Sequence, residues 1–317
     1  MPQRALITGC PGFAGGFLAE HLLGCGDAVL GCSPDGRWEE SSPSELSDRV
    51  ELLAWDLGRE ERPPGETRRA IEAFRPTAVY HLAAISVPKQ CGFEEPTPAA
   101  VAVNVAGTRR VMRLAAELPG RPRVLAISSS KVYAAVPPEA PPVDEQAPLG
   151  PWRAYGKTKL AAEAEVRRAV EQSGVDAVIA RSFQHTGPRQ GPEMMLPHWC
   201  QQLVAGGRGP IEVYTVDAFI DLSDVRDVVR AYRLLVERGA RGEVYNVGSG
   251  VCRRSGDVLA MLQKLAGQVR PVVEIYPGQK HNPIAEVSRL AEQTGWRATI
   301  PLEATVADTL AWWRQRM

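Results

Sequence analysis

A glycine-rich turn near the start of the chain constrains the fold more than any other stretch. Gly9, Gly12 and Gly15 follow the apolar run 5–7 and precede residues 13–23, whose apolar side chains recur at helical spacing. Strand, glycine turn and helix in this order are typical of dinucleotide-binding units, because the backbone can approach a pyrophosphate closely and the helix start offers free N–H groups. An ordinary glycine loop is the alternative, and the position between a strand and a helix favours the dinucleotide site.

Composition excludes several classes of function. Of the 317 residues 44% are hydrophobic, and 37 Lys and Arg balance 37 Asp and Glu, which argues against nucleic-acid or membrane-surface binding. The sequence has no apolar run near the length of a membrane span and no secretory signal pattern, so we expect a cytoplasmic protein. The six cysteines show no metal-ligand spacing, so we expect free thiols and no metal site.

Strands and helices alternate through the first half of the chain. The apolar runs predict strands at 28–31, 50–55, 78–84 and 123–128, with helices at 67–74 and 98–118 between them. This alternation predicts an α/β fold with a doubly wound parallel sheet, in which ligands bind beyond the carboxyl ends of the strands. The glycine turn, Asp56, Ala83 with Ala84, and the serines 128–130 stand at those ends.

The end of the second strand bears on the choice between NAD and NADP. An acidic residue there favours NAD, whereas a small polar residue with a nearby Arg accommodates the 2′-phosphate of NADP. Ser33 and Arg37 match the second pattern, although Asp35 lies between them. The sequence therefore favours NADP over NAD.

Tyr155 and Lys159 are candidate proton-transfer residues. They are four residues apart on a predicted helix, 154–171, so their side chains share one face. We expect the positive charge of the lysine to lower the pKa of the phenol. A surface helix with a half-buried tyrosine is the alternative, and the serine-ending strand 123–128 ahead of the helix favours the catalytic interpretation.

Together these motifs resemble the extended short-chain dehydrogenase/reductase family, which contains nucleotide-sugar epimerases, dehydratases and reductases. The resemblance covers nearly the whole chain: Thr8 to Gly15, Asp56-Leu57, His81 to Ala84, Asn104 to Thr108, Ser128 to Tyr133, Tyr155 to Lys159, Arg181 to Pro188, Asp224 to Asp227 and Tyr245 to Gly250. It implies a Rossmann fold with a smaller, mostly helical substrate domain.

The resemblance also implies roles for individual residues. Tyr155 would transfer the proton, Lys159 would hold the nicotinamide ribose, and Ser129, rather than Ser130, would hold the reacting oxygen. The implied cofactor-binding residues are Gly9, Gly12, Phe13, Ala14, Gly15, Ser33, Arg37, Asp56, Leu57, Leu82, Ala83, Ala84, Asn104, Tyr155, Lys159, Phe183 and His185.

Within the family, residues 184–190, 243–250 and 294–296 are most similar to the branch of GDP-4-keto-6-deoxy-mannose reductases and GDP-mannose dehydratases. Dehydratases carry a Glu where this chain has Lys131, so the resemblance favours redox chemistry or epimerisation over water elimination. A solvent-facing Lys131, with a base supplied elsewhere, is the alternative.

The substrate end departs from the family pattern at Gln184, Ile220 and Tyr276, where relatives have an Asn and two Arg that contact the diphosphate. Neither Ile nor Tyr can replace a guanidinium fork. Arg189, Arg253, Arg254 and Lys280 are candidate replacements. The expected substrate contacts are Ser86, Ser130, Lys131, Gln184, Arg189, Trp199, Ile220, Arg254 and Tyr276; Trp199 could equally be a core residue.

The expected organisation places 1–182 and 211–249 in the Rossmann domain and 183–210 and 250–317 in the substrate domain. The resemblance implies an NAD(P)-dependent reductase of a 4-keto-6-deoxy nucleotide sugar and a homodimer. Alternatives are a nucleotide-sugar 4-epimerase and an enzyme for a sugar without a nucleotide. A non-catalytic nucleotide sensor is disfavoured because both Tyr155 and Lys159 are present.

Overall fold

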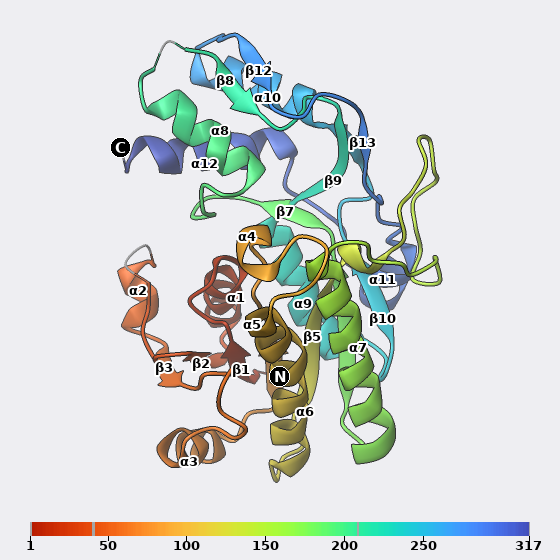
Figure 1. The fold of residues 1–317 in the computed structure, drawn as a ribbon. Helices are drawn as coiled ribbons and strands as arrows, with labels where there is room; N and C mark the ends of the chain where they lie inside the picture. Colours follow the sequence, from red (N-terminus) through yellow and green to blue (C-terminus); the bar gives the residue numbers. More distant parts are fainter. Residues whose placement is uncertain (1, 40–41, 208, 317) are drawn as a thin grey trace.

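A seven-stranded parallel sheet forms the body of the protein in a computed structural model that describes residues 2–39, 42–207 and 209–316 (Figure 1). Its strand order is β10-β6-β5-β4-β1-β2-β3. The strands are β1 (Arg4–Thr8), β2 (Ala28–Ser33), β3 (Glu51–Ala54), β4 (Ala78–His81), β5 (Arg123–Ser129), β6 (Ala177–Ser182) and β10 (Val244–Val247). The order reverses between β1 and β4, which confirms the predicted doubly wound sheet and places the ligand crevice at that point.

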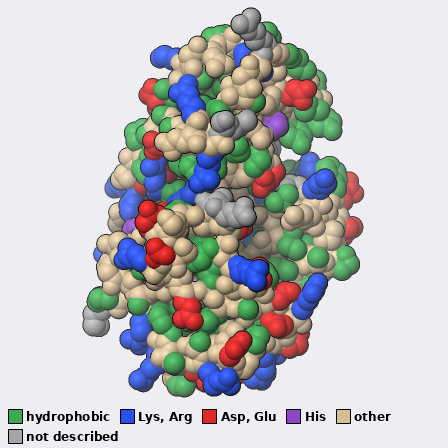
Figure 2. All heavy atoms as spheres, turned by 90° about the vertical axis from the view of Figure 1, so that its left-hand side faces the viewer, with side chains coloured by type: hydrophobic (Ala, Val, Ile, Leu, Met, Phe, Trp, Pro, Cys, Tyr) green, Lys and Arg blue, Asp and Glu red, His purple; other side chains and the backbone are tan. Residues whose placement is uncertain are grey.

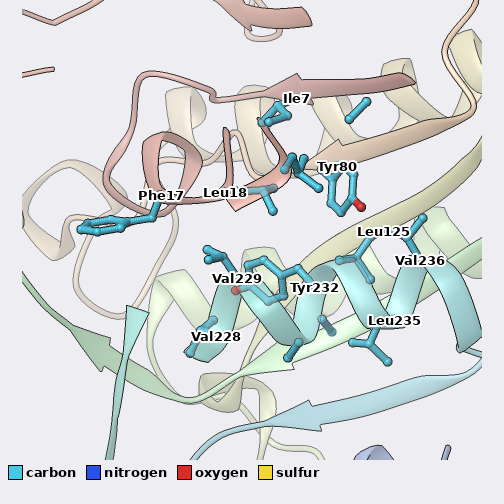
Figure 3. Packing of buried hydrophobic residues seen from close by; sticks show 14 of the residues in the cluster. Ile7, Phe17, Leu18, Tyr80, Leu125, Val228, Val229, Tyr232, Leu235 and Val236 are labelled. Carbon is cyan, nitrogen blue, oxygen red and sulfur yellow. The ribbon is translucent and has the colours of Figure 1, made fainter. Parts of the chain in front are cut away.

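Helices cover both faces of the sheet. One face packs against α1 (Phe13–Gly24) and α9 (Val225–Arg238), the other against α3 (Gly65–Phe74), α6 (Gly107–Glu117) and α7 (Ala154–Ser173). Figure 3 shows Val229, Tyr232 and Val236 of α9 packed toward Leu18 of α1 and Tyr80 of β4. Burying apolar surface on both faces is what makes these strands read as continuous apolar runs.

The predicted helix 98–118 is interrupted in its hydrogen bonding. It consists of α5 (Pro98–Ala100), a π-helical segment (Val101–Ala106) and α6, in one continuous rod. Asn104, in the π-helical segment, is buried and bonded to the loop after β4. A π-helical segment widens the helix locally, and such segments are frequent at functional sites.

The smaller lobe lies above the carboxyl ends of the sheet strands in Figure 1. Its helices are α8 (Met195–Val204), α10 (Ser255–Ala266) and α12 (Leu302–Arg314), which share one apolar core. The remaining short helices of the chain are α2 (Ser44–Ser47), α4 (Pro88–Cys91), a 3-10 turn (Ser130–Val132) and α11 (Ser288–Thr294).

The sequence pattern does not predict the short strands of the lobe. β9 (Ala218–Asp224) pairs with β7 (Gln184–Thr186), β11 (Cys252–Arg254) and β13 (Lys280–His281), and β8 (Ile211–Val213) pairs with β12 (Val272–Glu274). The lobe is therefore less helical than expected. Because residues 211–213 and 218–224 pair with lobe strands, we propose that the second Rossmann segment covers 225–249 rather than 211–249.

The mixture of charges on the surface is as expected from the equal numbers of basic and acidic residues. Figure 2 shows Lys and Arg side chains interspersed with Asp and Glu over the face that it presents. Among the described residues, every helix is too short or too polar to cross a bilayer. The six cysteines are free thiols.

Candidate active site

The glycine turn lies at the switch point between β1 and β4. Gly9 has φ +73°, and a Cβ there would come within 2.7 Å of the Ala83 backbone N, just beyond β4. Gly12 precedes α1, and within the described part of the chain no side chain caps that helix start. Its N–H groups and positive dipole therefore suit a pyrophosphate. The Phe13 ring stacks on His185, with centroids 6.0 Å apart, so two expected cofactor residues from distant segments meet at the turn.

The end of β2 forms a compact turn. Ser33 Oγ accepts a hydrogen bond from the Arg37 N–H at 3.0 Å and lies 3.3 Å from Asp35 Oδ1, to which it donates. Ser33 is buried, whereas Asp35 and Arg37 are exposed. The turn thus brings the expected serine and arginine together, with Asp35 beside them.

Several expected cofactor residues support the site without offering a free side chain. The Asn104 amide oxygen accepts the Ile85 N–H at 2.7 Å, and its NH₂ donates to Ile85 O and Thr158 Oγ. The Phe183 ring packs in a buried cluster with Tyr133 and Ala285. Asp56 binds the Gly58 N–H at 2.8 Å. The remaining expected residues of the strand ends are buried (Gly15, Leu57) or partly buried (Ala14, Leu82, Ala83, Ala84).

Ser129, Tyr155 and Lys159 come together at the carboxyl end of β5. Lys159 is 5% exposed, its Nζ donates to Ile127 O at 2.8 Å, and the same nitrogen lies 5.9 Å from the centre of the Tyr155 ring. Burial lowers the pKa of Lys159 to about 8, against the opposing effect of Glu163. Tyr155 and Lys159 therefore share one face of α7, as their four-residue spacing predicts.

The expected direction of the Tyr155 pKa shift is wrong. Burial raises the pKa of Tyr155, with a further rise from Cys91, and a hydrogen bond with Ser129 opposes this only in part. Loss of solvation is the largest of these effects. The phenol is therefore protonated at neutral pH, which makes it a proton donor.

A buried polar network behind Lys159 was not predicted. The Glu163 carboxylate, one helical turn beyond Lys159, accepts a hydrogen bond from Ser128 Oγ at 2.6 Å and two from Arg181 at 2.9 and 2.8 Å. Arg181 also donates to Tyr133 Oη, which donates to Asn246 Oδ1 at 2.6 Å. Each of these residues stands in one of the family motifs except Glu163, whose i+4 spacing from Lys159 was the available signal.

His81 is a structural residue at the carboxyl ends of the sheet strands. Thr108 Oγ donates to Asn104 O at 2.7 Å, so it accepts from His81 Nε2 at 2.9 Å, and His81 Nδ1 accepts from Thr8 Oγ at 2.7 Å. Burial, aided by the Lys159 charge, lowers the pKa of His81 to about 3. A neutral imidazole thus joins β1, β4 and α6.

Lys131 is half-buried and hydrogen-bonded within the protein rather than fully facing solvent. Its Nζ donates to Asn282 Oδ1 at 2.8 Å, from the segment after β13 in the smaller lobe. Burial, followed by the charge of Arg153, lowers the pKa of Lys131 to about 8. The Lys131 N–H donates to Ser129 Oγ at 3.2 Å, so lysine and serine are held in one turn.

The structure places four expected substrate contacts either in an apolar core or in a pair with a carboxylate. Trp199 and Ile220 are 3% and 4% exposed and belong to the core of the smaller lobe. Arg189 makes two 2.7 Å hydrogen bonds to Glu20 of α1, and Arg254 pairs with Asp217 at 2.6 Å. Sequence spacing could not reveal these partners, because they lie 169 and 37 residues away.

Other expected contacts keep unused polar groups. Gln184 Oε1 is buried and has no hydrogen-bond partner among the described residues, and the same holds for Arg253 Nε on β11. Tyr276 is exposed and stacks on Tyr214, with centroids 5.7 Å apart and Lys280 Nζ 5.5 Å from its ring. Ser86 is exposed and Ser130 is buried. A buried acceptor and a buried guanidinium Nε–H, both without partners among the described residues, are what a polar ligand would satisfy.

Comparison with known proteins identifies relatives over the whole chain. Residues 5–248 match the model of the NAD dependent epimerase/dehydratase family. The chain is similar to a GDP-6-deoxy-D-mannose reductase of Pseudomonas aeruginosa, 26% identical over 100% of this chain and 99% of that protein. It is also similar to a UDP-glucose 4-epimerase of Mycolicibacterium smegmatis, 28% identical over 99% of both. The solved structure of RMD from Pseudomonas aeruginosa complexed with NADPH superposes with a TM-score of 0.80, at 27% identity over 99% of this chain and 100% of that one.

Proposed function

The chain belongs to the NAD-dependent epimerase/dehydratase family and is an enzyme of the NAD(P)-dependent oxidoreductase type, and from this premise we propose that it reduces a 4-keto-6-deoxy nucleotide sugar. The observation that carries the proposal is the placement of Tyr155 beside Ser129 and Lys159, with Lys159 Nζ 5.9 Å from the centre of the Tyr155 ring. A reductase needs a proton donor at the carbonyl oxygen, and Tyr155 is that donor.

The residues present fit a nicotinamide dinucleotide. Gly9 and Gly12 would cradle the pyrophosphate at the uncapped start of α1, and Phe13 with His185 would line the same end. Ser33 and Arg37 would bind a 2′-phosphate, which favours NADP over NAD. When bound in its reduced form, the cofactor supplies the hydride.

The side chains of the site divide the proton chemistry among them. Tyr155 donates its proton to the sugar oxygen as that oxygen becomes negative. Ser129 Oγ accepts the Lys131 N–H, which leaves the Ser129 hydroxyl hydrogen to be donated to the same sugar oxygen. Lys159 holds the nicotinamide ribose and stabilises the tyrosinate that remains, and Ile127 O keeps the ammonium in place.

The smaller lobe would hold the nucleotide diphosphate. With Arg189 and Arg254 paired to carboxylates, Arg253 is the candidate fork, and the Gln184 amide adds a second polar group. Lys131 in place of a carboxylate supports reduction over water elimination, because elimination needs a base beside the serine.

A 4-epimerase is the second candidate, supported by the similarity to the Mycolicibacterium smegmatis epimerase. The same three residues would serve it, with the cofactor retained between oxidation and re-reduction. A cofactor that co-purifies with the protein supports the epimerase, whereas freely exchanging NADPH supports the reductase.

The test combines binding and turnover. Melting temperature is measured with NAD, NADP, GDP, GDP-mannose and UDP-glucose, because a ligand of the native state raises it. NADPH oxidation is then measured with GDP-4-keto-6-deoxy-mannose. We expect stabilisation by NADP and by a nucleotide sugar, with turnover. Stabilisation by a dinucleotide alone would overturn the nucleotide-sugar assignment in favour of a sugar without a nucleotide.

A further inference from the structure

Lys131 and Arg153 stand two residues from Ser129 and Tyr155 in the sequence. Among the described residues, neither takes part in an ion pair, whereas the neighbouring Lys157 pairs with Glu95 at 2.5 Å. Lys131 is half-buried, and a charge that is partly buried is ordinarily paired. The lysine therefore asks for an anion from outside the chain, and Arg153, which is exposed, can contact the same anion.

Lys131 is held in place by a neutral oxygen. Asn282 Oδ1 accepts its 2.8 Å hydrogen bond, and Asn282 Nδ2 donates to Phe219 O at 3.0 Å, which fixes the amide with its oxygen toward the lysine. An ammonium has three N–H donors, so this bond leaves two for another acceptor. Asn282 orients the lysine without neutralising it.

Arg153 is oriented by stacking. Its guanidinium carbon lies 4.2 Å from the centre of the Phe93 ring and 4.1 Å from that of the Trp152 ring, and these rings meet edge to face. Aromatic rings hold a guanidinium by its face, so the N–H edge remains for a planar anion. Arg153 also precedes the 20-residue helix α7, whose first turn has no acidic residue.

Both cations are tied to the catalytic residues by the backbone. Lys131 follows Ser129 in one turn, and its carbonyl packs so closely on Gly156 that a Cβ there would overlap the carbonyl oxygen. Gly156 and Arg153 flank Tyr155 within three positions. The charge of Arg153 contributes to the lowered pKa of Lys131, which agrees with their proximity.

We propose that Lys131 and Arg153 bind an acidic substituent, such as a carboxylate, of the sugar that reacts at Tyr155. The inference rests on the proposed function only for placing a sugar at Tyr155, and it adds a second negative group besides any diphosphate. Because C6 of a 6-deoxy sugar is a methyl group, the acidic substituent of such a sugar would be attached at a position other than C6. A carboxylate would accept the fork of Arg153 and a hydrogen bond from Lys131.

The test compares sugars that differ in one carboxylate. Dissociation constants of the NADP-loaded protein are measured by calorimetry for UDP-glucuronate against UDP-glucose, and for glucuronate 1-phosphate against glucose 1-phosphate. We expect the acidic member of a pair to bind about tenfold to a hundredfold more tightly, the size of one charged hydrogen bond. K131Q and R153Q should each reduce that preference about tenfold.

Matched variants and the two sugar pairs keep the outcomes distinct. K157Q, in which the removed cation has Glu95 as partner, should retain the full preference. R153Q changes an exposed residue and remains informative if K131Q fails to fold. An acid preference seen only in the pair without nucleotide supports the inference and contradicts the nucleotide-sugar function. Equal affinities within each pair, no binding of either pair, or a preference that survives both substitutions would overturn the inference.

Discussion

The catalytic end of the sheet and the smaller lobe treat polar side chains differently. At the catalytic end Glu163, His81 and Asn104 are buried with every contact made inside the protein. In the lobe Gln184 Oε1, Ser223 Oγ and Arg253 Nε are buried without a hydrogen-bond partner among the described residues. These three buried side chains at the catalytic end need no further partner, whereas the lobe is built around groups that it does not satisfy, as a binding surface is.

Tyr155→Phe tests the catalytic end most severely. The variant keeps the ring and loses the proton, so we expect kcat to fall about a thousandfold, worth about 4 kcal/mol of barrier. Cofactor affinity, measured by fluorescence titration, should change little. Turnover close to that of the unaltered enzyme would remove Tyr155 from the mechanism.

Glu163→Gln tests whether the network behind Lys159 stabilises the fold as strongly as its contacts indicate. It leaves Arg181 buried without its carboxylate, so we expect a loss of about 3 kcal/mol in the free energy of unfolding, measured in urea. It should also lower the pKa of Lys159 further, because Glu163 raises that pKa. Glu165→Gln removes a pair with the exposed Arg168 and should cost under about 1 kcal/mol. Equal losses in the free energy of unfolding for Glu163→Gln and Glu165→Gln would show that the buried network behind Lys159 stabilises the fold no more than an exposed ion pair does.

Gly9→Ala and Gly26→Ala separate backbone strain from steric overlap. Both glycines have positive φ, +73° and +80°, but only a Cβ at Gly9 meets other atoms, those of the Ala83 backbone. We expect Gly26→Ala to cost about 1 kcal/mol from strain and Gly9→Ala about 2 kcal/mol more, with loss of dinucleotide binding. Equal melting temperatures for the two variants would show that the close approach to β4 carries no energy.

Arg253→Gln against Arg254→Gln tests the lobe. The first removes a guanidinium whose buried Nε has no partner among the described residues, and the second removes one that pairs with Asp217. We expect Arg253→Gln to weaken GDP binding about tenfold, and Arg254→Gln to leave it within about twofold. The reverse order would return Arg254 to the substrate site.

The pH dependence should be the smallest effect. With the pKa of Lys159 lowered to about 8, the charged form decreases about twofold between pH 7 and pH 8, and turnover should decline in proportion. The decline should persist in K131Q, because Lys131 is a separate group of similar pKa. A flat profile to pH 9 would show that the charge of Lys159 is not needed.

Backbone requirements can be predicted from the sequence, and side-chain partners cannot. The glycine turn, the alternation of strands and helices and the Tyr155–Lys159 pair follow from spacing, because close approach and helical faces impose periods on the chain. Arg189 and Arg254 resemble free cations in the sequence because Glu20 and Asp217 are brought to them only by folding. Ile220 and Trp199 are in the apolar core of the lobe, which needs such residues more than a substrate site does. The lobe strands are two to seven residues long, too short for a period to show.

The packing of α9 on α1 also fixes an order in time. About 200 residues separate the two helices, and a ribosome takes about 10–40 s to add them at ordinary rates. Until α9 emerges, Leu18 and Tyr80 lack the apolar neighbours shown in Figure 3, and Asp27 lacks its 2.8 Å partner Arg233. During most of its synthesis, the nascent chain therefore exposes the face of its N-terminal strands and helices that α9 later covers. A chaperone that binds nascent chains would bind at that face.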